Sequence, residues 1–161
     1  MIIKYESKYS EDVKDLLVEL QEYIVSIDRE KYNIITPEYR EKYFIEAIEE
    51  VNKNNGQILL AKEENKIVGL VIGLIIKPIN EYAFKAPKRG RISELIITQK
   101  YRKNKMGGLL LESMEEYLRV NGCEDILIEV FGYNDLAIKF YDKHGYNTRL
   151  LEVTKKIKGK E

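Results

Sequence analysis

Residues 91–118 constrain the fold more than any other stretch of this 161-residue chain. An apolar run over residues 92–97 leads into a polar, basic loop at 98–105, which is followed by two adjacent glycines. Apolar residues then recur at helical spacing, so the pattern predicts a strand, a loop and a buried helix that starts near Met106. The first amides of a helix have no partner within it, and the helix dipole makes that end positive. Since glycines let an anion approach the backbone, this loop is predicted to bind a phosphate or diphosphate.

The loop does not carry either of two common nucleotide-binding motifs. A P-loop needs two glycines that bracket four residues and then Lys-Ser or Lys-Thr, and a dinucleotide fingerprint needs three spaced glycines. The stretch instead resembles the acyl-CoA loop of the GNAT superfamily of N-acyltransferases: Arg or Gln, two residues, Gly, one residue, then Gly or Ala. Arg102, Met106 and Gly107 fill their places in this pattern. Lys105 departs from it, because the first glycine is usual at that position.

A second stretch, residues 128–146, is similar to the second GNAT signature. That signature is a strand, an Asn that begins a helix, an Ala three residues later, an aromatic pair, and a Lys-x-Gly-aromatic ending. The matching residues here are Asn134, Ala137, Phe140, Tyr141, Lys143, Gly145 and Tyr146. Two patterns in the right order make a chance match improbable, and together they cover roughly the C-terminal half of the chain.

The order of the predicted elements agrees with this resemblance. Helical stripes are predicted from Ser10 to about residue 27 and from Thr36 to about residue 53, and an antiparallel hairpin from runs at 57–62 and 67–76. A strand at 125–131, a short helix after Asn134, a last strand or hairpin at 146–157 and a solvated tail follow. The chain is thus expected to be one domain, 1–161, of α/β (α+β) class. Its GNAT-like fold would have a mixed, mostly antiparallel central sheet of about six to seven strands and about four flanking helices.

The resemblance also assigns roles to residues. It places acetyl-CoA as a co-substrate, with no metal, and gives the acyl and pantetheine arm to the backbone around Leu95, Ile96 and Ile97. The diphosphate falls to the loop residues Arg102, Lys103, Asn104, Lys105, Met106, Gly107 and Gly108, and the pantetheine or adenylate side to Asn134. Tyr141 becomes the general acid, since a phenol with a pKa of about 10 is chemically suited to that role.

Two carboxylates compete for the role of general base, because an alkylammonium must lose a proton before it can attack a thioester. Glu94 interrupts an apolar run, and Glu129 lies in the following predicted strand, five residues before Asn134. Burial would raise the pKa of either toward the useful range, and we favour Glu94. The residues alone allow other roles: both glutamates could face solvent, and Tyr141 lies on the apolar stripe of its helix.

Composition limits the kinds of partner that the sequence predicts. Twenty-seven basic and 27 acidic residues cancel, so no overall charge favours nucleic acid or membrane, and no apolar run approaches the length of a membrane span. One cysteine excludes an internal disulfide and suits a reducing cytoplasm. The expected partner is a primary amine on a small molecule or peptide, with specificity in the loops 28–36 and 77–88. Asp28, Glu30 and Glu81 in these loops suit a cationic acceptor, and a homodimer is a family-level expectation.

Two other classes of function remain open from the sequence. A non-catalytic acyl-CoA-binding or sensing module would keep the fold without turnover, and Lys105 in the usual glycine position favours it. A nucleic-acid-binding domain would use the basic runs at 85–91 and 100–105, and its retention on DNA would fall steeply with salt. The balanced charge and the lack of a recognition motif argue against the second alternative.

Overall fold

The computed structural model describes residues 1–159, so the end of the predicted solvated tail, residues 160–161, lies outside the described range. Residue contacts divide the chain into two compact units, Met1–Ile128 and a second unit that begins at Glu129. The first unit contains β1 (Ile2–Lys4), the 3-10 turn η1 (Ser7–Tyr9), α1 (Ser10–Ile27), α2 (Tyr39–Lys53), β2 (Gln57–Glu63), β3 (Lys66–Ile76), β4 (Ile79–Asn80), β5 (Lys85–Ala86), β6 (Arg89–Ile97), the 3-10 turn η2 (Gln99–Tyr101), α3 (Met106–Val120) and β7 (Asp125–Ile128). The second unit contains α4 (Asp135–Lys143).

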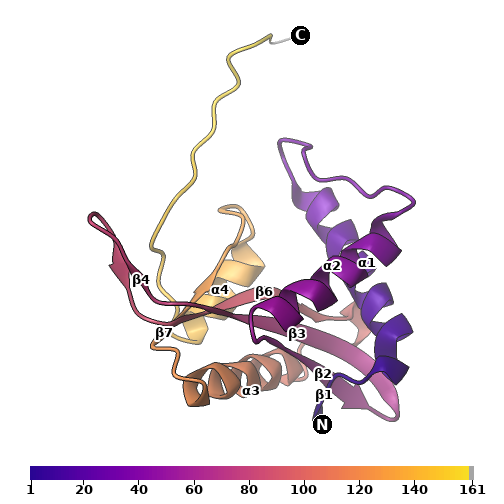
Figure 1. Ribbon diagram of the computed structural model, residues 1–161. Coiled ribbons are helices and arrows are strands. Elements are labelled where there is room, and N and C mark those ends of the chain that lie inside the picture. The colour runs from indigo at the N-terminus through magenta and orange to yellow at the C-terminus, as the bar shows by residue number, and fades with distance from the viewer. Residues whose placement is uncertain (160–161) are drawn as a thin grey trace. The chain divides into compact units, whose positions relative to one another are not determined.

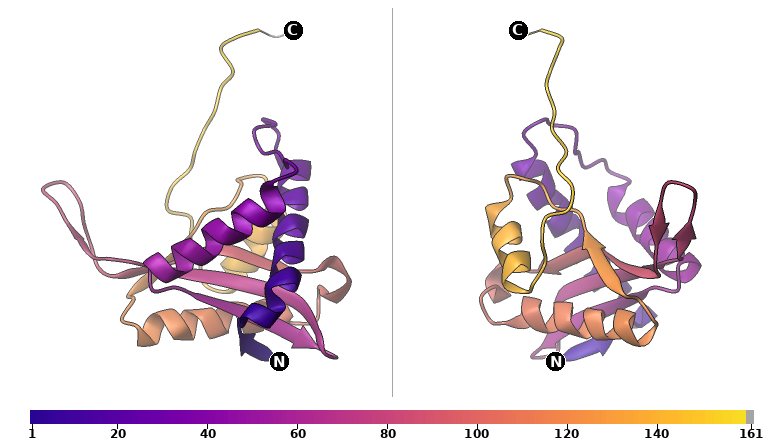
Figure 2. Two further views of the ribbon diagram at one scale, coloured as in Figure 1. Left: turned by 45° about the vertical axis from the view of Figure 1, so that its right-hand side comes forward. Right: turned by 90° about the vertical axis from the view of Figure 1, so that its left-hand side faces the viewer.

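The central sheet has the strand order β1-β2-β3-β6-β7. Neighbouring strands are antiparallel except for β6 and β7, which are parallel and joined through α3. The predicted mixed, mostly antiparallel sheet and its helical crossover are therefore confirmed, as are about four helices, although this sheet has five strands and not six or seven. The β4 and β5 strands form a separate ribbon, which Figure 2 shows projecting beyond the sheet.

Helices cover both faces of the sheet, with α1 and α2 on one face and α3 on the other (Figure 1). The α1 side contains the main core, which the predicted helical and strand stripes supply: Val13, Leu16, Leu17, Ile58, Leu60, Leu70, Ile72, Leu74 and Ile96. Residues of α2, including Tyr43 and Phe44, pack against this cluster. Burying such apolar side chains contributes roughly 1.5–3 kcal/mol each, so this face fixes where α1 and α2 lie.

Close contacts with neighbouring elements explain two glycines inside β3: α3 lies against Gly73, and β6 lies against Gly69. A Cβ atom at Gly73 would lie 2.2 Å from Sδ of Met114, and one at Gly69 would lie 2.4 Å from Cδ1 of Ile97. Both distances are too short for an ordinary contact, so a Cβ atom at Gly73 would require Met114 of α3 to shift, and one at Gly69 would require β6 to shift.

The structure corrects several element boundaries. The first helix begins at Ser10 as predicted, whereas the second begins at Tyr39 rather than at Thr36. The strand predicted at 125–131 ends at Ile128. The strand or hairpin predicted at 146–157 was wrong: no strand lies in that segment, where adjacent apolar and adjacent lysine residues break the period-2 alternation that a half-buried strand requires. In residues 1–159 no helix is long and apolar enough to cross a bilayer.

Candidate active site

Strand β6, which precedes the predicted anion-binding start of α3, has an open edge. Pairing of β6 with β7 ends at Ile92 and Ile128, whereas β6 continues to Ile97 while still paired with β3. Along Ser93–Ile97, no strand of the described chain pairs with the edge of β6 that faces away from β3. The backbone amides and carbonyls there can accept an extended ligand in the manner of an added strand.

A β-bulge at Ser93 determines which way the side chains beyond it point. On β3, Gly73 pairs with Ile92 and Ile72 pairs with Glu94, so Ser93 has no partner in this register. Directly paired residues share a face of the sheet, so Ile92 lies on the α3 face with Gly73, and Glu94 on the α1–α2 face with Ile72. Strict alternation would have placed Ile92 and Glu94 on the same face, and the bulge reverses this.

Glu94 is half-buried under α2. The phenol of Tyr43 donates a hydrogen bond to its Oε1, and the ring of Tyr39 stacks on that of Tyr43 at 4.9 Å and 13°. Burial raises the pKa of Glu94 from 4.5 to about 7, and it does so against the Tyr43 hydrogen bond and the positive charge of Arg91, which both lower it. A carboxylate with such a pKa exchanges protons near neutral pH.

The loop between β6 and α3 presents backbone donors. The first backbone hydrogen bond of α3 runs from the amide of Leu109 to the carbonyl of Lys105 at 3.1 Å, so the amides of Met106, Gly107 and Gly108 have no partner within the helix. Lys105 precedes the helix in the left-handed conformation, with φ 60° and ψ −2°. Glycine is the residue that adopts this conformation without steric cost, which gives a physical reason for the usual glycine at this position.

Side chains around the loop divide into two groups. Those of Lys103 and Lys105 are exposed at the helix start. The side chain of Arg102 instead contacts β6 and α1. Its Nε donates to the carbonyl of Ile97 at 2.9 Å, and its Nη2 lies 3.8 Å from Oε1 of Glu19. Three unpaired amides, two lysines and the positive end of a 15-residue helix fit a diphosphate.

The remaining predicted residues belong to the second unit. Asn134 precedes α4, and its side chain accepts a hydrogen bond from the amide of Ala137 at 3.3 Å, so the predicted cap is confirmed. Tyr141 is half-buried on the same helix, in edge-on contact with Phe140 and Tyr146. Glu129 is exposed and lies directly after β7 rather than within a strand.

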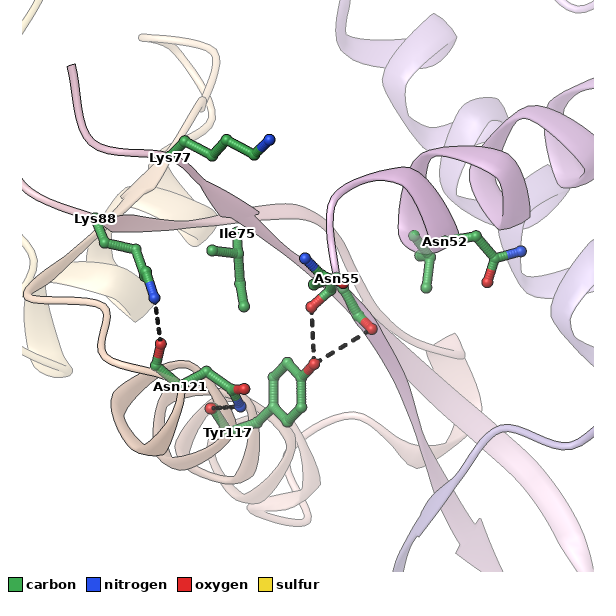
Figure 3. Close-up of a pocket in the computed structure, with 9 residues that line it drawn as sticks. Asn52, Asn55, Ile75, Lys77, Lys88, Tyr117 and Asn121 are labelled. Atoms are coloured by element: carbon green, nitrogen blue, oxygen red, sulfur yellow. Dashed lines mark hydrogen bonds between the residues drawn. The ribbon is translucent and has the colours of Figure 1, made fainter.

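A cavity of about 630 Å³ opens at the other end of the sheet, between the C-terminal ends of α2 and α3 (Figure 3). Its polar groups bond largely to one another: the hydroxyl of Tyr117 donates to the carbonyl of Asn55 at 2.8 Å, and Nζ of Lys88 donates to the carbonyl of Asn121 at 3.2 Å. These bonds satisfy helix-end carbonyls. We therefore do not assign the reaction to this cavity, which lacks both the open strand edge and the helix start.

One predicted acceptor-loop residue has a structural role instead. Asp28 is 2% exposed, and its carboxylate accepts hydrogen bonds from the amide of Glu30 and from the backbone and side-chain amides of Asn33. The Asn33 bonds lower the pKa of Asp28 from 3.8 to about 2. The carboxylate therefore shapes the loop after α1 and is not presented to a cationic acceptor.

Comparison with known proteins agrees with these features. The sequence model of the acetyltransferase (GNAT) family matches residues 20–146, and the chain belongs to this family. No curated protein matches the chain.

Solved structures share the fold at low sequence identity. A tetramutant of the BH1408 protein from Bacillus halodurans has a TM-score of 0.80 at 17% identity, covering 98% of this chain and 99% of its own. An aminoglycoside acetyltransferase, meta-AAC0020, from an uncultured soil metagenomic sample was solved with sisomicin and has a TM-score of 0.67 at 18% identity, with coverage of 98% and 96%. AAC(6')-Iy, in complex with the bisubstrate analogue CoA-S-monomethyl-acetylneamine, has a TM-score of 0.72 at 12% identity and covers 97% of each chain.

Sequence reasoning missed two aromatic residues of the site. Neither Tyr43 nor Tyr39 belongs to the motifs that predict the site. The two tyrosines are four residues apart on α2, which places them one above the other on the same face. That spacing was the available signal, but the strand to which they point could not be known before the fold.

Proposed function

We propose that this protein is an acetyl-CoA-dependent N-acetyltransferase that moves an acetyl group to a primary amine by direct transfer in a ternary complex. The observation that carries the proposal is the position of Glu94. This carboxylate, with its pKa raised to about 7, lies on a strand with a free edge, and the loop at 98–105 joins that strand to the amide-rich start of α3. The acceptor is a small molecule or a protein amine, and the 1–161 chain acts as one domain.

The binding roles follow from the donors of the first unit. The amides of Met106, Gly107 and Gly108 and the ammonium groups of Lys103 and Lys105 bind the diphosphate of the coenzyme. The backbone of Leu95, Ile96 and Ile97 binds its pantetheine arm along the free edge of β6. Asn134 contributes from the pantetheine or adenylate side while it also caps α4. Acetyl-CoA, when bound, supplies the acetyl group as a reactive thioester.

Two side chains move protons. Glu94, directly or through a water, accepts the proton that the ammonium of the acceptor must lose, and a pKa near neutrality suits this role. We favour Glu94 over Glu129 as base because the side chain of Glu129 is exposed, whereas Glu94 lies under α2 with a hydrogen bond from Tyr43. The phenol of Tyr141 holds the proton that the departing sulfur requires.

The acceptor is proposed to be cationic before it reacts. Glu94 supplies negative charge at the site, and the loops after α1 and between β3 and β6 supply the surrounding surface. Since two of the structural neighbours are aminoglycoside acetyltransferases, an aminoglycoside is a reasonable member of any acceptor panel. We propose that the protein acts in the cytoplasm, because a chain with one cysteine cannot form an internal disulfide and suits a reducing compartment.

A thiol-release assay tests the proposal. Purified protein with acetyl-CoA should release CoA thiol in the presence of at least one member of a panel of polyamines, aminoglycosides, lysine peptides and peptides with free N-termini. Tyr141→Phe and Glu94→Gln should each lower kcat with little change in acetyl-CoA affinity. Unchanged turnover in both variants would remove the two residues from the mechanism.

The alternative is an acyl-CoA-binding module without turnover. Lys105, in a left-handed conformation where the family pattern has glycine, is the feature that favours it. Calorimetric binding of acetyl-CoA without thiol release across the whole panel would support this alternative over the enzyme.

A further inference from the structure

The carboxylate of Glu94 is held from one side only. Its Oε1 accepts the hydrogen bond from Tyr43, whereas Oε2 accepts none from the residues that the structure describes. One oxygen is thus fixed and the other is left for a water or an amine. An ionised carboxylate with a single neutral donor keeps much of its basicity, because each added donor stabilises the charged form.

The phenol that holds Glu94 is itself held firmly. Tyr43 packs against the main core from α2, and its ring is covered by the stacked ring of Tyr39. The N-terminal turns of α2 are tied to α1 by ion pairs of Arg40 with Asp15 at 2.7 Å and with Glu11 at 3.0 Å. Exposed ion pairs contribute little to the free energy of folding, so apolar packing is the main interaction that holds α2 in place.

We propose that Tyr43 is a positioning residue for Glu94: its hydroxyl fixes Oε1 so that Oε2 faces the reacting amine. This inference rests on the proposed function, and it adds a residue from α2 to the site. The charged and titratable groups that face the pair are Tyr39 and Glu46 from α2 and Arg91 from β6. None of them bonds to Glu94 in place of Tyr43.

Removing the hydroxyl has two separable consequences. In Tyr43→Phe the ionised form of Glu94 loses its donor, so the carboxylate titrates at higher pH and the acid limb of the kcat/KM profile moves the same way. The carboxylate also loses its fixed orientation, so kcat on the alkaline plateau falls by about tenfold. The KM for acetyl-CoA stays unchanged, because Tyr43 lies on the face of the sheet opposite α3.

The experiment is a ¹³C NMR titration of glutamate side-chain carboxyls in the full chain, without coenzyme or amine, with Glu94 assigned through Glu94→Gln. Tyr5→Phe is the matched control, because it also deletes a hydroxyl from a tyrosine that packs on α2. The Tyr5 hydroxyl is hydrogen-bonded to Ser10 at 3.0 Å and not to Glu94. Tyr43→Phe should move the Glu94 titration to higher pH, and Tyr5→Phe should not. Should Tyr43→Phe fail to fold, 3-fluorotyrosine at position 43 keeps the ring and is a stronger donor, so it should move the titration to lower pH.

An unmoved Glu94 titration in folded Tyr43→Phe, or in the fluorinated protein, overturns the role of Tyr43. The role is also overturned if the Glu94 titration moves in Tyr43→Phe while the kcat/KM pH profile of the active enzyme does not. Because the titration requires neither substrate, a lack of turnover in the wild-type protein counts against the proposed function alone.

Discussion

Glu94 lies directly opposite Ile72 in the β3–β6 ladder, and this pairing places its carboxylate on the α1–α2 face of the sheet. The face matters because α2 buries the carboxylate there, and burial is the main cause of its raised pKa. The bulge at Ser93 creates the pairing, so a one-residue irregularity in a strand places the proposed base.

Replacing this carboxylate should remove proton transfer and leave coenzyme binding intact. Glu94→Gln is nearly isosteric, and its amide oxygen can still accept from Tyr43. We expect kcat to fall by about 10²- to 10⁴-fold, the usual contribution of a positioned base, with the Kd for CoA unchanged. Steady-state kinetics with calorimetry checks this, and Glu49→Gln at an exposed position of α2 is the control. Full activity in Glu94→Gln would exclude Glu94 as the base.

The same substitution should make stability less dependent on pH. A carboxyl whose pKa in the folded protein is raised from 4.5 to about 7 favours folding fully below pH 4.5 and loses that contribution as pH rises through 7. Relative to wild type, Glu94→Gln should therefore gain stability between pH 5 and pH 8, by on the order of 3 kcal/mol. Urea unfolding at both pH values measures the difference. A difference that is the same at both would mean that Glu94 has an ordinary pKa.

Lys105 allows backbone strain and charge to be tested separately. Lys105→Gly and Lys105→Ala both remove the ammonium, but only the alanine keeps a Cβ in the left-handed conformation. We expect Lys105→Gly to be more stable than Lys105→Ala by about 1 kcal/mol in the free energy of unfolding. Both should bind CoA more weakly than wild type and to a similar degree. Equal stability of the two variants would show that the conformation carries no strain.

Asp28 should stabilise the loop after α1 through its charge. Its pKa is lowered to about 2, so its contribution is present above pH 4 and is lost as pH falls toward 2. Asp28→Asn should be less stable than wild type at pH 7, and the difference should shrink between pH 4 and pH 2.5. Chemical unfolding tests this, with Glu22→Gln at an exposed position of α1 as the control. A difference that persists undiminished at pH 2.5 would contradict the role of the charge.

Local sequence patterns predicted the helices and strands of this fold better than they predicted how those elements pair and pack. The apolar runs around residues 63–66 predicted the β2–β3 hairpin, and the helical stripe after Met106 predicted α3, because each depends on neighbours in the chain. The bond from Tyr43 to Glu94 could not be predicted, since it requires the placement of a helix on a strand far from it in sequence. The strand expected at 146–157 does not form, because adjacent apolar and adjacent lysine residues in that segment break the alternation that a half-buried strand requires.

The central claim is that the amides at the start of α3 bind the diphosphate of coenzyme A. Isothermal titration calorimetry with CoA and with pantetheine, which lacks the diphosphate, tests it most directly. We predict that CoA binds at least about 100-fold more tightly than pantetheine, as loss of the charge-assisted hydrogen bonds to the diphosphate requires. Equal affinities, or no detectable binding of CoA at millimolar concentration, would contradict the claim and the enzyme assignment with it.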